Sequence, residues 1–338
     1  MRLRRWDPAG PALRRRRRGR GFSYEDVDGR RLIDDETLRR IRALAIPPAW
    51  RDVRICPWPN GHLQAVGTDD AGRRQYLYHP QWRARKDREK FARILEFGWR
   101  LPDARKQIAE DLRSRGLNRR RVLGAAARLL DLGFFRVGGE QYAEENGSYG
   151  LATLLARHVE VRRGHTLVFD YPAKSGQERV QSVADEQVVA VIRALLRRRD
   201  PDDTLLAYYQ DRGWHNVNSA DINGYLHELF GDDISAKDFR TWHGTVLAAA
   251  ALAVAERTDT PTARKRARTQ AMREVGACLG NTPAVCRSSY VDPAVVDAFE
   301  RGQTIKAAVA GVDTDEIGGL AMNPSIERAV LELLTGDE

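Results

Sequence analysis

Hydrophobic and polar residues alternate in short runs over the first ~85 residues of the chain, as expected for β-strands. The segment LQAVGTDDAGRRQYLYHP (residues 63–80) contains two such runs, separated by Asp-Asp-Ala-Gly at residues 69–72. Asp and Gly favour tight turns, so these two runs predict a β-hairpin. We therefore expect a small β-rich domain over residues 1–85.

From residue 83 onward, apolar residues recur every three or four positions, which predicts helices. Residues 122–133 and 188–196 show this pattern most clearly, and the terminal NPSIERAVLELLTGDE predicts a further amphipathic helix. Three short β-type runs interrupt the helical pattern at residues 158–183. The expected fold class is α+β. A larger, mainly α-helical catalytic domain (residues 86–338) with a three-stranded β insert would follow the first domain after a linker near residues 83–90.

The charge of the chain indicates a polyanionic partner. The 56 Lys and Arg exceed the 47 Asp and Glu, for a net charge of +9. The surplus is concentrated in three clusters, at residues 14–21, 113–121 and 263–270. Such clusters are typical of proteins that bind nucleic acid through its phosphates. Solvated basic faces or a basic tail would be the alternative interpretation.

Other features suit a soluble cytoplasmic protein. The longest apolar run, at residues 246–255, is half of the roughly 20 residues that a membrane span needs. The N-terminal MRLRRWDPAG has no apolar stretch after its arginines, so no secretory signal is expected. The three cysteines include no C-x-x-C pair and are expected to be reduced thiols.

Several common catalytic signatures are missing from the sequence. It contains no G-x-x-x-x-G-K-[ST] phosphate-binding loop and no complete G-x-G-x-x-G fingerprint. Its seven histidines lack the spacing of metal ligands. Phosphoryl transfer would then depend on side chains alone: a nucleophile, donors to the phosphate oxygens and an acid for the leaving group.

Four segments contain candidates for this chemistry: FFRVGGEQY (residues 134–142), YPAKSGQ (171–177), KDFRTWHGT (237–245) and LGNTPAVCRSSYVDP (279–293). In the first, Arg136 follows a predicted helix and precedes two glycines that would let a phosphate approach. Lys174 is at a predicted turn tip, and Arg240 is at the start of an apolar helix. In the last segment, Tyr290 stands nine positions after Asn281. Each residue taken singly would be an ordinary structural or surface residue, so the prediction depends on their combination.

These four segments, in this order, resemble the type IB DNA topoisomerases of the compact bacterial and poxvirus kind. The first-domain segments GRGFSYEDVDGRRL, LAIPPAWRDVRICP and GRRQYLYHP also resemble that family, so the likeness covers roughly residues 14–300. It implies that Tyr290 attacks a DNA phosphate, forms a 3′-phosphotyrosyl linkage and expels a 5′-hydroxyl. Arg136 and Arg240 would bind the non-bridging oxygens, and Lys174 would protonate the leaving oxygen. Lys237 matches a secondary basic position of the family, with a surface lysine as the alternative.

The sequence departs from the family pattern at Asn281. Many relatives, and the related tyrosine recombinases, have histidine nine residues before the tyrosine. If the reaction required a base at this position, the activity of this chain would be impaired, because the amide of Asn281 does not titrate. A hydrogen-bond donor to a phosphate oxygen can be supplied by an amide just as well. We favour the donor interpretation; a helix or turn cap is the structural alternative.

Four further residues match or suit DNA contacts. Tyr76 and Tyr78 are two positions apart on a predicted strand and would therefore face the same side. Gln75 matches a DNA-contacting position of the family, although it shares its strand face with Leu77. Tyr142 also matches a family DNA contact. The alternatives are a hydrophobic sheet face for the tyrosine pair and a core position for Tyr142.

The resemblance implies a monomeric, nucleoid-associated enzyme that closes as a two-lobed clamp around duplex DNA. It would relax positive and negative supercoils without ATP, metal or another cofactor. A tyrosine site-specific recombinase is one alternative, although its N-terminal domain is usually helical. A non-enzymatic architectural DNA-binding protein is the other, since the basic clusters alone would suffice for binding.

Overall fold

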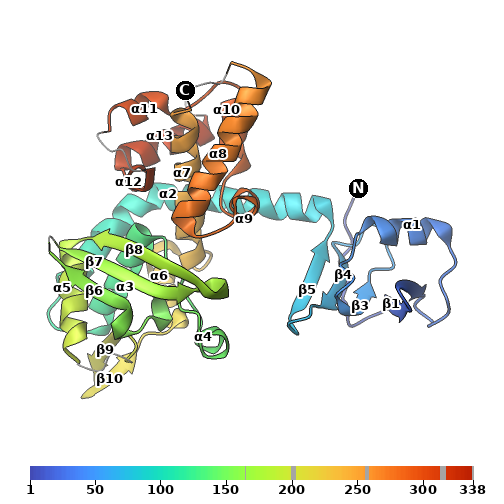
Figure 1. Cartoon of the computed structure of the whole chain (residues 1–338), viewed down its shortest axis with the longest axis horizontal. Coiled ribbons are helices and arrows are strands. Elements are labelled where there is room, and N and C mark those ends of the chain that lie inside the picture. Colours follow the sequence, from blue (N-terminus) through green and yellow to red (C-terminus); the bar gives the residue numbers. More distant parts are fainter. Residues whose placement is uncertain (164, 199–202, 256–258, 313–316, 337–338) are drawn as a thin grey trace. The chain divides into compact units, whose positions relative to one another are not determined.

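The computed structural model describes residues 1–163, 165–198, 203–255, 259–312 and 317–336, and it divides the chain into two compact units. Unit 1 spans Met1–Phe91 and unit 2 spans Ala92–Glu338. Unit 1 is built on a β-sheet and unit 2 is largely helical, which confirms the predicted α+β class (Figure 1).

Unit 1 contains a five-stranded antiparallel sheet in the order β2-β1-β3-β4-β5. Its elements are β1 (Leu13–Arg18), β2 (Gly21–Glu25), α1 (Asp35–Ala43), β3 (Arg51–Ile55), β4 (Leu63–Thr68) and β5 (Arg74–Tyr78). Ile41 of α1 packs in a buried cluster with apolar residues of three strands, among them Ile55 and Ala65. The predicted hairpin is confirmed as β4–β5: Asp69 accepts hydrogen bonds from the backbone N–H groups of Ala71 and Arg73 and so fixes the turn.

Helix α2 (Pro80–Leu112) is 33 residues long. Residues 83–90, where a linker was expected, are part of this helix. Arginine and lysine make up most of this segment, and both are good helix formers, so its polarity is compatible with a helix.

Unit 2 contains most of the helices and two further sheets. The helices are α3 (Arg119–Gly133), α4 (Glu140–Asn146), α5 (Glu186–Leu195), α6 (Ser219–Phe230), α7 (Ala236–Ala253), α8 (Pro261–Leu279), α9 (Pro283–Ser289), α10 (Pro293–Glu300), α11 (Lys306–Ala310), α12 (Ile317–Leu320) and α13 (Pro324–Thr335), with short 3₁₀ turns η1 (Leu151–Thr153), η2 (Ala156–His158), η3 (Lys174–Gly176) and η4 (Leu196–Arg198). Every residue of α7 except Lys237 is buried, so this helix forms the centre of the unit. Helix α8 packs along it (Figure 1).

The predicted three-stranded insert is confirmed as the antiparallel sheet of β6 (Val159–Arg162), β7 (Thr166–Ala173) and β8 (Gln177–Ala184). A second hairpin, β9 (Ala207–Gln210) and β10 (Gly213–Asn216), was not predicted. Its turn places Asp211 and Arg212 at positive φ, a conformation more often taken by glycine. The predicted C-terminal helix is α13, whose Ile326 and Val330 are buried.

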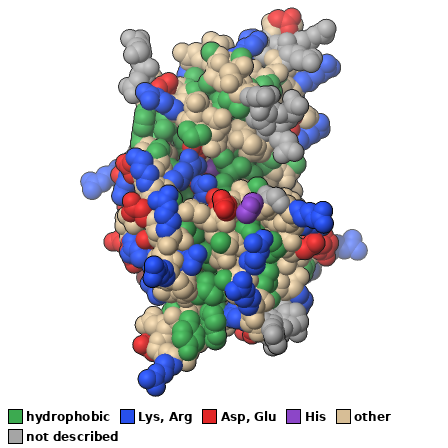
Figure 2. Space-filling model, turned by 90° about the vertical axis from the view of Figure 1, so that its left-hand side faces the viewer, with side chains coloured by type: hydrophobic (Ala, Val, Ile, Leu, Met, Phe, Trp, Pro, Cys, Tyr) green, Lys and Arg blue, Asp and Glu red, His purple; other side chains and the backbone are tan. Residues whose placement is uncertain are grey.

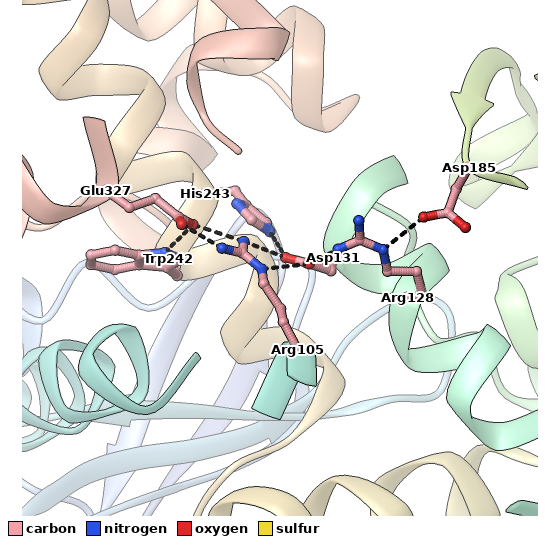
Figure 3. A network of polar contacts seen from close by, with 7 residues as sticks. All are labelled: Arg105, Arg128, Asp131, Asp185, Trp242, His243 and Glu327. Carbon is pink, nitrogen blue, oxygen red and sulfur yellow. Dashed lines mark hydrogen bonds and ion pairs between the residues drawn. The ribbon is translucent and has the colours of Figure 1, made fainter. Parts of the chain in front are cut away.

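A buried polar network joins four helices of unit 2 (Figure 3). Arg105 of α2 donates to both carboxylate oxygens of Asp131 on α3 and to Glu327 on α13. Trp242 of α7 donates to the same Glu327, and the Nε2 atom of His243 lies 3.3 Å from Asp131. Burial alone would raise the pKa of Asp131, but His243 and Arg105 outweigh burial and hold this pKa well below its usual range. The network therefore fixes α7 against α3 and α13.

Candidate active site

A cavity of about 300 Å³ in unit 2 brings together five of the six residues predicted to be catalytic. Its lining consists of Arg136, Val137, Gly138, Gly139, Ser148, Tyr149, Lys174, Ala236, Lys237, Arg240 and Tyr290. The sixth, Asn281, is not part of the lining but is hydrogen-bonded to Arg136. The five lining candidates come from four separate segments of the sequence, which fold around one space.

Arg136 is positioned by the end of α3 and by the two glycines that follow it. Phe134 ends the helix in the left-handed conformation, with φ at 54°. Gly138 has φ at +82°, and a Cβ atom there would lie 2.9 Å from the Cα of Gly150, so glycine is required. A Cβ at Gly139, which lines the same cavity as Arg136, would meet no atom within 4 Å.

Arg240 is 3% exposed and lies in the second turn of α7. It donates to the carbonyl oxygens of Phe134 and Leu279, and its guanidinium carbon lies 5.1 Å from the centre of the Tyr290 ring. Its Nε atom is buried and has no partner among the described residues. Burial, and next the charge of Arg136, lower the pKa of Arg240 to about 10, so the group remains charged at neutral pH. A bound anion would relieve this destabilisation.

Asn281 lies between α8 and α9, and its amide has a defined orientation. The Nη2 atom of Arg136 lies 2.7 Å from Oδ1 of Asn281. Arginine can only donate, so the oxygen of the amide must face it. The Nδ2 atom is buried and has no hydrogen-bond acceptor in the described part of the chain. Asn281 thus has a buried donor without a partner beside Arg136; the donor interpretation is compatible with this geometry and stays a prediction.

Tyr290 follows α9 and is half-buried. Its backbone N–H donates to the carbonyl oxygen of Cys286. Gly244 of α7 packs directly against it: a Cβ at this glycine would lie 2.7 Å from the Tyr290 carbonyl oxygen. The backbone N–H and carbonyl groups of Tyr290 are therefore both packed or hydrogen-bonded, which fixes the position of its Cα atom.

Both candidate lysines are exposed at the cavity. Lys174 is the first residue of η3, the turn between β7 and β8, as the sequence predicted. Lys237 is in the first turn of α7 and is the one residue of that helix that is not buried. Both ammonium groups can therefore meet a charged ligand without being desolvated beforehand.

The candidates for DNA contact in unit 1 lie on β5. Tyr76 and Tyr78 are 49% and 39% exposed and stack with ring centroids 6.2 Å apart, so they share one face as predicted. Gln75 is on the other face and donates to Asp69 in the hairpin turn. Tyr142 belongs to α4, but its side chain lies outside the described part of the structure.

Arg179 of β8 contacts the backbone next to the site without lining the cavity, and the sequence did not single it out. It donates to the carbonyl oxygens of Ala277 and Cys278, just before Asn281. With 49 arginines in the chain, only its place five residues after Lys174 could have drawn attention to it.

On the face shown in Figure 2, Lys and Arg side chains are spread over much of the surface, with acidic side chains between them. The described residues contain no group of three or more His, Cys, Asp or Glu side chains that could hold a metal ion. No helix among them is both long and apolar enough to span a membrane.

Comparison with known proteins assigns the chain to a family. The family model for the eukaryotic DNA topoisomerase I catalytic core matches residues 79–314, and that for the bacterial DNA topoisomerase IB N-terminal domain matches residues 21–69. DNA topoisomerase 1B of Acanthamoeba polyphaga mimivirus is 31% identical over 285 residues, which are 82% of this chain and 84% of the viral protein. DNA topoisomerase 1 of Schizosaccharomyces pombe is 27% identical over 164 residues, 48% of this chain and 19% of the yeast protein. The chain belongs to the type IB DNA topoisomerases, isomerases that act on duplex DNA.

Proposed function

We propose that the protein relaxes supercoiled duplex DNA by transesterification through Tyr290, without ATP or metal. The phenolic oxygen of Tyr290 attacks a phosphodiester, a P–O bond to the tyrosine forms, and the bond from phosphorus to the 5′-oxygen breaks. The 3′-phosphotyrosyl linkage conserves the bond energy while one strand rotates about the other. The free 5′-hydroxyl then attacks the linkage and restores the strand. Each step exchanges one phosphodiester for another, so no external energy source is needed.

One observation carries this proposal: a tyrosine, two arginines and two lysines line a single cavity. Arg136 and Arg240 provide permanent charge and several donors for the non-bridging oxygens of the phosphate. Lys174 protonates the leaving 5′-oxygen, and Lys237 assists from the first turn of α7. The free Nδ2 donor of Asn281 completes the set of donors around the phosphate.

The substrate contacts proposed for unit 1 are the exposed rings of Tyr76 and Tyr78. They lie on one face of β5 and would rest against the sugar-phosphate backbone or bases of the duplex. Gln75, bonded within the hairpin turn, would support the turn or reach DNA after that bond is exchanged. We further propose that the enzyme acts as a monomer at the nucleoid, on supercoils of either sign.

Relaxation of a negatively supercoiled plasmid in EDTA, without ATP, tests the proposed function. The wild type should relax the plasmid, Tyr290→Phe should not, and denaturing the wild-type reaction should trap protein on a 3′-phosphate. Relaxation by Tyr290→Phe would exclude this tyrosine as the nucleophile. Binding by the wild type without relaxation would favour an architectural protein, and strand exchange between two sites would favour a recombinase.

A further inference from the structure

Three guanidinium groups converge on the C-terminal end of α8. Arg136 donates to the carbonyl oxygen of Gly280 at 2.6 Å, and Arg240 donates to that of Leu279 at 2.7 Å. Arg179 donates to the carbonyl oxygens of Ala277, at 3.2 Å, and Cys278. Four successive carbonyl groups thus each accept a bond from an arginine. The last carbonyls of a helix have no partner within it and carry the negative end of its dipole, so they suit cations.

Arg179 differs from the other two arginines because it does not line the cavity. Its Nε atom donates to Gln181, and both of its Nη atoms donate to the end of α8. None of the carboxylates in the described ranges lies within ion-pair distance of it. Burial lowers the pKa of Arg179; Tyr171 opposes this shift and the charge of Arg136 adds to it. Such an arginine is suited to holding the protein together rather than to binding phosphate.

The contacts of Arg179 connect two parts of the site. Its own strand, β8, begins directly after the turn that carries Lys174. The carbonyls that it binds belong to the last turn of α8, which leads into Asn281 through Gly280. Gly280 has φ at +59°, and a Cβ there would lie 3.2 Å from Nη1 of Arg179, so the guanidinium packs closely on this glycine.

We propose that Arg179 is a positioning residue for strand cleavage. It fastens the hairpin that carries the proton donor, Lys174, to the helix end that carries the phosphate donor, Asn281. This inference rests on the proposed function, which assigns those two roles. Catalytic groups act only when their geometry relative to the reacting atoms is held, and a displacement of about 1 Å can cost 10²-fold in rate.

The test compares variants in single-turnover cleavage of a duplex oligonucleotide, with the yield of covalent protein–DNA adduct as the readout. Arg179→Ala should lower the cleavage rate constant about 10²-fold. Its dissociation constant for DNA should stay within about threefold of wild type, because Arg179 contacts no cavity surface. Arg179→Lys keeps the charge but cannot bridge two carbonyls as the arginine fork does, so its rate should be intermediate. Arg162→Ala, which removes an exposed arginine from the same sheet, serves as the matched control and should cleave normally.

Two further readouts separate positioning from general damage to the fold. In a substrate with sulfur in place of the 5′-bridging oxygen, the leaving thiol is far more acidic than the 5′-alcohol and can leave as the thiolate without a proton donor. This substrate should restore much of the rate of both Lys174→Ala and Arg179→Ala. In a double-mutant cycle, Arg179→Ala should cost much less in an Asn281→Ala background than in wild type. The proposal would be overturned if the losses of cleavage rate in the two single variants simply multiplied in the double variant and sulfur restored no rate to Arg179→Ala. A wild-type cleavage rate for Arg179→Ala would overturn it as well.

The outcome remains interpretable if the alanine variant does not fold, because Arg179→Lys is subjected to the same two readouts. Thermal unfolding of each variant identifies any loss of folded protein. Failure of the proposed function has a different signature: wild type itself would form no adduct, or Tyr290→Phe would form one. If wild type and Tyr290→Phe behave as proposed and the Arg179 variants show neither rescue nor coupling, only the positioning role is wrong.

Discussion

The substitution Asn281→Asp distinguishes the role of the side-chain oxygen of Asn281 from that of its Nδ2 donor. The carboxylate has nearly the same shape, and one oxygen can still accept the 2.7 Å bond from Arg136. The other oxygen replaces the buried Nδ2 donor, which has no partner among the described residues. The variant therefore keeps the contact inside the protein and removes only the donor that we assign to the phosphate.

The expected loss of cleavage rate is that of removing one hydrogen-bond donor. Removing one donor to a developing negative charge costs about 10²–10³ in rate, or about 2.7–4 kcal/mol. Asn281→Ala should lose this amount. Asn281→Asp should lose at least as much, because its carboxylate also repels the phosphate and competes for Arg136. An amide does not titrate, so the pH profile of Asn281→Ala should keep the shape of the wild-type profile.

The assay is single-turnover cleavage with excess protein at several pH values, followed on a denaturing gel. Asn323→Asp is the matched control, because Asn323 caps α13 with its side-chain oxygen and aspartate caps a helix equally well. A wild-type rate for Asn281→Asp would refute the donor role. A basic limb in the wild-type pH profile that disappears in Asn281→Ala would also contradict it.

Three other predictions follow from the packing, the buried network and the surface of unit 1. Gly244→Ala should fold but slow cleavage about 10²-fold, because the new methyl group displaces the tyrosine main chain; Gly224→Ala, in open space on α6, should cleave normally. Asp131→Asn should lower the free energy of unfolding by about 3–5 kcal/mol in urea titrations at pH 7. The folded-state pKa of Asp131 is depressed, so its stabilisation is fully present above the unfolded pKa of about 4 and is lost progressively as the pH falls from there through the folded-state pKa. The stability deficit of the variant should therefore shrink as the pH falls, and a constant deficit would contradict this assignment. Replacing Tyr76 and Tyr78 together by alanine should raise the dissociation constant for duplex DNA about tenfold in fluorescence anisotropy at fixed salt, and unchanged binding would remove them from the interface.

The sequence predicted those parts of the site that depend only on neighbouring residues of the chain. Arg136 after a helix, Lys174 on a turn and Arg240 at the start of an apolar helix each depend on a few neighbouring residues, and the structure has each of them in that setting. The β4–β5 hairpin was predictable for the same reason, since the Asp69 turn is formed by side chain and backbone within five residues.

Features that depend on distant pairing could not be predicted. Arg105 meets Glu327 across 222 positions of sequence, and Arg179 meets the end of α8 across about 98. Neither residue is distinguished among so many arginines by its neighbours. The orientation of the Asn281 amide is also a tertiary property, because it is set by Arg136, which is 145 positions away.

The carbonyl contacts of the arginines bear on the catalysis proposed above. Arg136 and Arg240 carry like charges that repel each other, and after burial the charge of Arg136 is the next cause that lowers the pKa of Arg240. The end of α8 holds them apart by accepting one bond from each, and the same helix end leads into Asn281. The proposed phosphate donors come from three segments of the chain, and their shared contacts at the end of α8 would arrange them before DNA arrives. Preorganised donors need no rearrangement when charge develops on the phosphate oxygens, and in the proposed mechanism, which uses side chains alone, this would be the largest contribution to the rate enhancement.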